Sequence, residues 1–237
     1  MRCHQRMKMI ALLLMLVLLV VLSIHWMTHY LWLSFGVVIT AVLVFLVRFE
    51  TKVIEAREIV LLAVLAAIAA VSRIPFASIP SVQPTTFVIM MAGFVFGAES
   101  GLIVGIVAAL ASNMVLGQGP WTPWQMLAWG LVGLTAGLLR KRSFMKKTWG
   151  KVLFALAWGF LFGWIMNIWG LLAFAGADGF TDLTIFIPYF LGSAVFDMMH
   201  AVSNVFFFLV FGGLWLNILQ RFKTKYGLLD KCKGDSS

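Results

Sequence analysis

Long apolar runs alternate with short polar segments along the whole chain. Runs of this length predict membrane-spanning helices, and the period-two alternation of β-barrel strands is absent. The fourth to sixth runs are shorter than the ~20 residues of a full span. Eight segments can be delimited: Met9–Ile24, Leu31–Val47, Glu55–Ser72, Thr85–Phe96, Leu102–Leu116, Trp124–Leu139, Val152–Ala175 and Pro188–Leu219. The pattern predicts an all-α polytopic membrane protein.

The composition agrees with this pattern. The chain is 62% hydrophobic and 11% charged, and 237 residues cannot hide that much apolar surface in a soluble core. The net charge of +9 is assigned to membrane topology rather than to nucleic-acid binding. Cys3 and Cys232 lie in the terminal tails, so neither a disulfide framework nor a metal-binding spacing is expected.

Lysine and arginine are distributed unevenly between the predicted loops. With eight spans and a cytoplasmic N-terminus, the inner loops and tails hold 17 of the 18 Lys and Arg residues. Only Arg73 falls outside, and the outer loops carry Asp178 and Asp182 instead. Since short cytoplasmic loops are enriched in Lys and Arg, both termini are predicted to be cytoplasmic.

The N-terminus resembles a signal peptide, because the basic stretch Met1–Lys8 precedes an apolar run. No small-x-small cleavage site follows, so an uncleaved anchor helix is predicted. The first two segments form a pair of transmembrane helices within residues 1–50. Residues 51–237 then form a six-helix bundle with a basic tail.

The segment Gly117–Gln125 interrupts the apolar pattern with two prolines, two tryptophans and two glutamines. Pro120 and Pro123 lack a backbone donor and fix φ, so this segment is not expected to be helical. Tryptophan is common where apolar matter meets water. We expect a structured loop at the mouth of a membrane cavity.

Polar residues inside the last segment follow helical spacing. An ionisable residue in a span is costly, so they are expected to face the bundle interior. Pro188 suits the first helical position, and Asp197 and His200, at i and i+3, are expected to be able to pair. The residues that share this face are Tyr189, Ser193, Asp197, His200 and Asn204.

Other polar side chains lie at a similar depth, in the outer halves of their segments. Such residues are Gln83, Thr85, Asn113, Gln125 and Asn167. This concentration predicts a cavity open to the outside and closed below. For a lone asparagine such as Asn113 or Asn204, a hydrogen bond between helices is the alternative role.

Small residues also recur at four-residue spacing. The glycine pairs, among them Gly93/Gly97 and Gly133/Gly137, are assigned to internal helix packing. The alanine ridge of the third segment favours either internal packing or a docking face for a partner membrane protein. It consists of Ala63, Ala66, Ala67 and Ala70.

The sequence lacks the motifs of several classes of enzyme. The chain has no P-loop pattern and no His-Glu-x-x-His motif, so it is not itself an ATPase or a zincin. Ser193 and His200 lie two turns apart, too far for a nucleophile–base hydrogen bond. Three alternatives to solute binding remain: an intramembrane enzyme that uses Asp197 and His200, a proton-coupled transporter that uses Asp197, and a structural scaffold.

Three stretches carry a family resemblance: Ala63–Ala70, Arg73–Thr86, and Gly117–Gln125 with the glycines beyond it. Over roughly seven tenths of its length the chain resembles the substrate-binding S components of energy-coupling factor (ECF) vitamin transporters. Within that family, Arg73–Thr86 and Gly117–Gln125 look most like the cobalamin-specific members. Folate, riboflavin or a modified nucleobase would also suit an aromatic, amide-rich mouth.

The resemblance implies a multi-pass subunit of a prokaryotic plasma membrane that captures a vitamin and has no catalytic residue, bound metal or intrinsic cofactor. A membrane coupling protein and two ATPase subunits would be its partners and would use the ATP. The four alanines would face the coupling protein, and Ser81–Thr85 would close over the ligand. The expected ligand-binding residues are Gln83, Thr85, Asn113, Gln118, Trp121, Trp124, Gln125, Asn167, Tyr189, Asp197 and His200.

Overall fold

The structure, a computed structural model, describes residues 36, 39, 56–176 and 178–226. The predicted N-terminal helix pair and the domain boundary near residue 50 lie outside the described residues, positions 36 and 39 apart. The basic tail beyond Tyr226 lies outside them as well. The described bundle starts at Ala56.

Six long helices make up the described part, which confirms an all-α bundle. Short helical turns connect some of them: η2 (Ile74–Phe76), α7 (Ser143–Lys146) and α9 (Asp178–Thr181). The six are α3 (Ala56–Ser72), α4 (Pro84–Phe96), α5 (Ala98–Leu116), α6 (Thr122–Leu139), α8 (Thr148–Ala175) and α10 (Leu183–Tyr226). Four stretches are long and apolar enough to cross a membrane, namely Ala56–Phe76, Ala98–Leu116, Thr148–Ala175 and Leu183–Tyr226.

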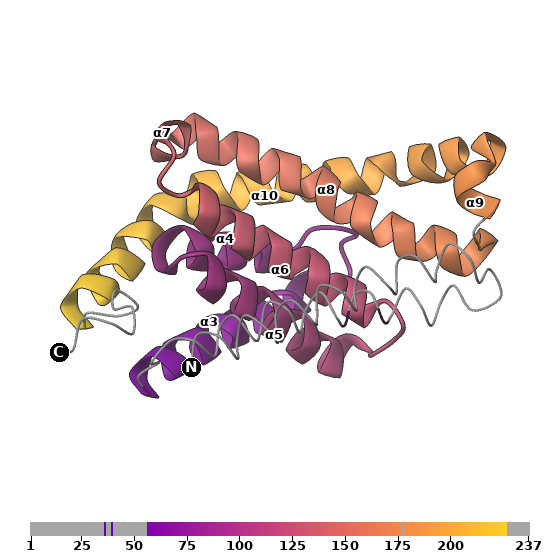
Figure 1. The fold of residues 1–237 in the computed structure, drawn as a ribbon. Coiled ribbons are helices and arrows are strands. Elements are labelled where there is room, and N and C mark those ends of the chain that lie inside the picture. Colours follow the sequence, from indigo (N-terminus) through magenta and orange to yellow (C-terminus); the bar gives the residue numbers. More distant parts are fainter. Residues whose placement is uncertain (1–35, 37–38, 40–55, 177, 227–237) are drawn as a thin grey trace, which may run out of the picture.

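The helices alternate in direction, which gives the bundle two chemically different ends (Figure 1). We call one the loop end, because residues 73–83, 117–121 and 176–182 connect helices there. We call the other the basic end, because Arg57, residues 140–151 and the end of α10 place their cations there. In Figure 1, α8 and α10 run side by side as a long antiparallel hairpin over α3–α6.

Helix α4 lies at the centre of the bundle. All 13 of its residues are buried, and it packs against α3, α5, α6 and α10. Its sequence has no polar face, which is typical of a helix surrounded by protein on every side. Ile89, Met90 and Met91 are fully enclosed and form the middle of the core together with Trp129 of α6.

Helices α5 and α6 cross at very short distance because glycines line their contact. A β-carbon at Gly133 would collide with the backbone of Gly101, and one at Gly101 would collide with Gly133. A β-carbon at Gly93 would likewise meet the Gly133 carbonyl. The predicted role of these glycines in internal packing is therefore confirmed.

Helix α5 corrects one predicted boundary. The apolar pattern predicts a fifth segment that starts at Leu102, and this prediction is wrong. Gly97, with φ 107°, is the single residue between α4 and α5. Helix α5 begins at Ala98 and has 19 residues. Ala98, Glu99 and Ser100 continue the helix, and Glu99 suits the positive end of the helix dipole in the first turn.

Helix α10 corrects a second boundary, because Pro188 does not start it. The helix begins at Leu183 and contains Pro188 internally. Asp182 accepts hydrogen bonds from the backbone N–H and the hydroxyl of Thr184, at 2.8 and 2.6 Å, as an N-cap does. These bonds lower the pKa of the Asp182 carboxyl. This cap outweighs the start signal of the proline.

The loop expected at Gly117–Gln125 is shorter than predicted. Gly117 ends α5 with φ 110°, and α6 already starts at Thr122. Pro123 stands in the first turn of α6, where its missing N–H costs no helical hydrogen bond. Trp124 and Gln125 are therefore helical, and the connection is confined to residues 117–121.

Candidate functional site

Asn113 is the centre of a hydrogen-bond network at the loop end. Its side chain is buried, and its Oδ1 accepts a 2.7 Å hydrogen bond from Arg73 Nη1. Its Nδ2 donates to Gln125 Oε1 at 2.7 Å and to Thr122 Oγ1 at 3.0 Å. One amide thus joins the end of α3, the end of α5 and the first turn of α6.

The same network fastens the connection between α5 and α6. The hydroxyl of Thr122 donates to Gln118 Oε1 at 2.9 Å and accepts from the N–H of Gly119 at 3.3 Å. Gln118 Nε2 donates to the Leu110 carbonyl at 3.1 Å. Gln118 is exposed, and its two hydrogen bonds stabilise the conformation of the α5–α6 connection.

A second chain of contacts forms a floor below the network. The Cζ atom of Arg73 lies 5.1 Å from the ring centroid of Trp129. Trp129 Nε1 donates to Thr86 Oγ1 at 3.0 Å, and that hydroxyl lies 2.8 Å from His200 Nε2. The His200 ring meets Phe162 edge-on at 4.8 Å. Helices α4, α6, α8 and α10 all contribute to this floor, and Arg73, which directly follows α3, contacts it through Trp129.

Asp197 belongs to a separate group of polar side chains, between α8 and α10. The hydroxyl of Ser193 lies 3.3 Å from the Asp197 carboxylate, and Asn167 Nδ2 donates to that hydroxyl at 2.6 Å. Asp197 and His200, which were expected to be able to pair, therefore have different partners. Asp197 is hydrogen-bonded to Ser193, and His200 to Thr86. Packing against α8 on one side and α4 on the other separates the two side chains.

The hairpin of α8 and α10 is packed tightly over only part of its length. Buried residues of α10 run from Asp197 to Leu219, and those of α8 stop at Phe162 apart from Leu171. The loop-end halves, residues 163–175 and 183–196, carry partly exposed polar and aromatic side chains. Trp169 in α8 meets Trp121 edge-to-face at 5.9 Å, which links this half of the hairpin to the α5–α6 connection.

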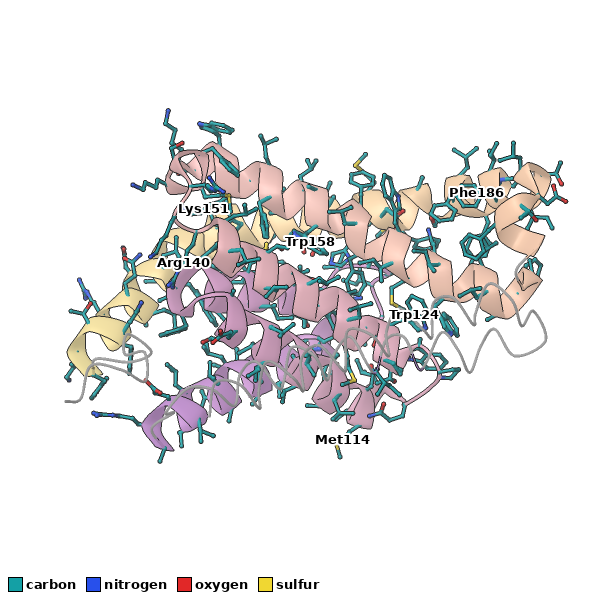
Figure 2. The ribbon with its side chains drawn as sticks, in the orientation of Figure 1. Met114, Trp124, Arg140, Lys151, Trp158 and Phe186 are labelled. Atoms are coloured by element: carbon teal, nitrogen blue, oxygen red, sulfur yellow. The ribbon has the colours of Figure 1, made fainter. Side chains whose placement is uncertain are left out.

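Three buried polar atoms at the loop end have no hydrogen-bond partner among the residues that the structure describes. They are Gln83 Oε1, Trp124 Nε1 and Trp169 Nε1, and Asn204 Oδ1 is a fourth, deeper in α10. An unsatisfied buried polar group costs about 1–3 kcal/mol, so such groups are rare. Figure 2 shows Trp124 toward the loop end and Arg140 and Lys151 toward the basic end. A bound polar solute at the loop end would satisfy the first three atoms.

The structure distributes the predicted binding residues over several places. Asn113, Gln118 and Gln125 share the network, Asn167 and Asp197 share the α8–α10 group, and His200 lies in the floor. The backbone N–H of Gln83 donates to Ser203 Oγ at 3.2 Å, and the Tyr189 hydroxyl lies against Gly170.

Thr85 lies apart from this polar site. It is fully buried in α4, and its hydroxyl donates to the Ala69 carbonyl at 2.9 Å. The segment expected to cover the ligand therefore ends before α4, at Gln83, and Ser81 within it has a positive φ of 60°.

Sequence reasoning did not single out three residues that hold the site together, namely Arg73, Thr86 and Trp129. Thr86 and Trp129 sit in apolar runs and give no signal of their own. Arg73 did give one, because it is the single Lys or Arg outside the predicted inner loops. Of the Lys and Arg residues that the structure describes, it alone lies at the loop end.

The predicted docking alanines fall on two sides of α3. Ala63 and Ala67 are exposed, whereas Ala66 and Ala70 are buried within the bundle. Ile59 and Val64, both exposed, extend the outer surface around Ala63 and Ala67. A partner that approaches α3 would meet only the first pair of alanines.

Two other features of the described residues bear on ligands. They contain no group of three His, Cys, Asp or Glu residues that could hold a metal ion. A groove at the basic end of α10 lies at the opposite end of the bundle from the network around Asn113. Its lining is polar and basic: Asn217, Gln220, Arg221, Thr224 and Lys225.

Apolar helices long enough to span a membrane, with a cluster of buried polar side chains at one end, define a multi-pass membrane protein. The family model described as "ECF transporter, substrate-specific component" matches residues 57–221, about seven tenths of the chain. The chain therefore belongs to this family and is a transport subunit, not a catalytic one. Family membership implies an ECF module as its partner. No solved structure matches the chain.

Proposed function

We propose that this S component binds cobalamin at the loop end and delivers it across the membrane together with an ECF module. The observation that carries the binding site is the set of unpartnered polar atoms on Gln83, Trp124 and Trp169. They lie on the α3–α4 connection, on α6 and on α8, all in the loop-end region of the bundle. The floor of Trp129, Thr86 and His200 closes that region from below.

The choice of cobalamin rests on the chemistry of this region and on the resemblance of Arg73–Thr86 and Gly117–Gln125 to the cobalamin-specific members. Cobalamin is a large, flat ligand rimmed by amide side chains, which both donate and accept hydrogen bonds. Indole N–H groups and a glutamine carbonyl complement amides, and the indole rings cover apolar surface. Folate, riboflavin and a modified nucleobase are the competing ligands.

The loop end faces the outside in this proposal, and both termini lie in the cytoplasm of a prokaryotic cell. The cations of residues 140–151 and of the end of α10 support that orientation, since cytoplasmic loops are enriched in Lys and Arg. A membrane coupling protein and two ATPase subunits would bind the bundle and hydrolyse ATP. Reorientation of the bundle would then open the site to the cytoplasm.

A thermal-shift screen of the purified full chain tests this function, with cobalamin, folate, riboflavin and a modified guanine base as ligands. We expect cobalamin to raise the melting temperature most, and the coupling protein and ATPase subunits to copurify with the chain. If a different vitamin raised the melting temperature most, that vitamin and not cobalamin would be the ligand. Proton-driven uptake by vesicles that contain only this protein would instead favour a transporter that uses Asp197.

Replacing Trp124 by phenylalanine is expected to weaken ligand binding without unfolding the protein. The change keeps an aromatic ring and removes the unpartnered Nε1 together with part of the volume of the indole. Losing one hydrogen bond to the ligand should lower the affinity about tenfold, which corresponds to ~1.4 kcal/mol. Titration of the ligand and thermal unfolding of the apo protein measure the two effects.

Trp129→Phe is the matched comparison, since Trp129 Nε1 has a partner in Thr86. That variant should lower the melting temperature of the apo protein, because Thr86 and His200 lose part of their network. An unchanged ligand affinity in Trp124→Phe would remove Trp124 from the site.

The double substitution Ala63→Trp and Ala67→Trp is expected to prevent association with the ECF module and to preserve the affinity for cobalamin. Both positions are exposed on α3, so the bundle itself accommodates larger side chains there. Copurification of the ATPase subunits and ligand titration measure the two properties. Leu209→Trp, at an exposed position of α10, is the control. Normal copurification of the double variant would exclude this face of α3 as the docking surface.

A further inference from the structure

Arg73 is a half-buried cation inside the bundle, immediately after α3 and within the candidate span Ala56–Phe76. Its Nη1 donates to Ser112 Oγ at 3.1 Å and to Asn113 Oδ1 at 2.7 Å. The face of Trp129 lies below its guanidinium. All three of these partners are uncharged, so the arginine keeps its full positive charge.

Among the side chains that the structure describes, no carboxylate forms an ion pair with Arg73, whose contacts are with Ser112, Asn113 and Trp129. Asp197 is hydrogen-bonded to Ser193, and Asp182 caps α10. Glu58 and Glu99 lie in the first turns of α3 and α5, at the basic end of the bundle. Arg73 lies at the loop end, directly after α3, and its side-chain contacts are with Ser112, Asn113 and Trp129.

Such an arrangement is costly unless an anion completes it. Charged side chains in a span or a protein interior are usually paired, because their desolvation costs several kcal/mol per ion. Amide and hydroxyl acceptors and a cation–π contact offset only part of that cost. The arginine is nevertheless fixed in place by two buried side chains, Ser112 and Asn113.

We propose that Arg73 binds an anionic group of the ligand, a phosphate or a carboxylate, and that Ser112 and Asn113 position its guanidinium for this contact. The inference rests on the proposed function, because the phosphodiester of cobalamin is such a group. Only Nη1 is used in the described hydrogen bonds. The remaining edge of the guanidinium has the fork geometry that binds phosphate and carboxylate oxygens in pairs.

The position of Arg73 above the floor also favours an anionic group from the ligand. The Trp129 ring beneath it belongs to the chain of contacts that ends at His200, in the middle of the bundle. A ligand anion that reaches the loop end above Trp129 would therefore meet the guanidinium.

The experiment compares two corrinoids that differ only in one phosphate, cobinamide and cobinamide phosphate, with cobalamin as the reference ligand. Their affinities are measured for the wild-type chain and for Arg73→Gln and Arg73→Lys. We expect wild type to prefer cobinamide phosphate by about ten- to a hundredfold, the range for a charge-assisted hydrogen-bonded pair. Arg73→Gln should remove this preference, and Arg73→Lys should keep part of it.

Arg142→Gln, an exposed cation at the basic end, is the charge-matched control and should keep the full preference. A folding defect in Arg73→Gln would lower both affinities together, so their ratio still reports the contact. An equal preference in wild type and Arg73→Gln overturns the role of Arg73 while cobalamin binding stands. Failure of wild type to bind any of the three corrinoids overturns both proposals.

Discussion

Replacing Asn113 by aspartate is expected to abolish high-affinity binding of cobalamin while the bundle stays folded. The aspartate would place a carboxylate oxygen where Oδ1 now accepts from Arg73 Nη1 at 2.7 Å. The hydrogen bond becomes an ion pair within the protein, and the arginine loses its attraction for an anion from the ligand. The new carboxylate also repels that anion directly.

The expected size of this effect is set by the short distances involved. Two charges about 4 Å apart near a protein surface interact by about 4 kcal/mol, so a loss of at least about a hundredfold in affinity is expected. The fold should survive, because Gln125 can turn its amide and donate to the carboxylate in place of the present 2.7 Å bond. Ligand titration and the melting temperature of the apo protein measure the two outcomes.

Asn217→Asp is the matched control, since it makes the same chemical change at an exposed position near the basic end of α10. It should leave cobalamin affinity at the wild-type value. If Asn113→Asp binds cobalamin as tightly as wild type and melts at the same temperature, the network around Asn113 does not set the charge of the site.

Replacing Gly133 by alanine is expected to destabilise the described bundle strongly. The added β-carbon would collide with the backbone of Gly101, which belongs to a neighbouring helix and cannot rotate away as a side chain would. Helices α5 and α6 would have to separate, and the buried α4 that packs against both would lose contacts. Overpacking of this kind costs about 2–3 kcal/mol, or roughly 5–10 °C in melting temperature.

Thermal unfolding of the purified protein checks this prediction, with Gly213→Ala as its control. Gly213 is an exposed helical glycine of α10, and a β-carbon there meets nothing within 4 Å. Because alanine is the better helix former by about 1 kcal/mol, this control should be neutral or stabilising. Equal melting temperatures for the two variants would contradict the close crossing of α5 and α6.

The predicted boundaries show which local signals dominate in this chain. Glycine was a reliable terminator, since Gly97 and Gly117 both end helices with positive φ. Proline was not a reliable starting point in α10, because the cap by Asp182 lies six residues earlier and Pro188 is inside the helix. The two prolines of Gly117–Gln125 predict a non-helical segment, whereas Pro123 suits the first turn of α6 and leaves Trp124 and Gln125 helical.

The candidate site was predictable as a region more than as a set of contacts. Helical spacing and depth indicated that Asn113, Asn167, Asp197 and His200 would turn inward toward one end. They could not show that His200 meets Thr86 whereas Asp197 meets Ser193, because those choices depend on which helix packs against each face. The roles of Thr86 and Trp129 had no signal in the sequence, since a threonine and a tryptophan in an apolar run usually belong to the core.

The sequence by itself determined that this protein is a polytopic helical membrane protein with an asymmetric distribution of charge, because hydrophobic length and Lys and Arg placement are properties of the chain alone. It also marked Gly117–Gln125 and the polar face of the last helix as the parts that differ from plain membrane spans. The tertiary structure decided which polar groups satisfy one another and which remain without a partner. It brought Arg73, separated by about 40 residues from Ser112 and Asn113, into contact with neutral acceptors only. The balance between a paired and an unpaired buried charge is set by neighbours in space.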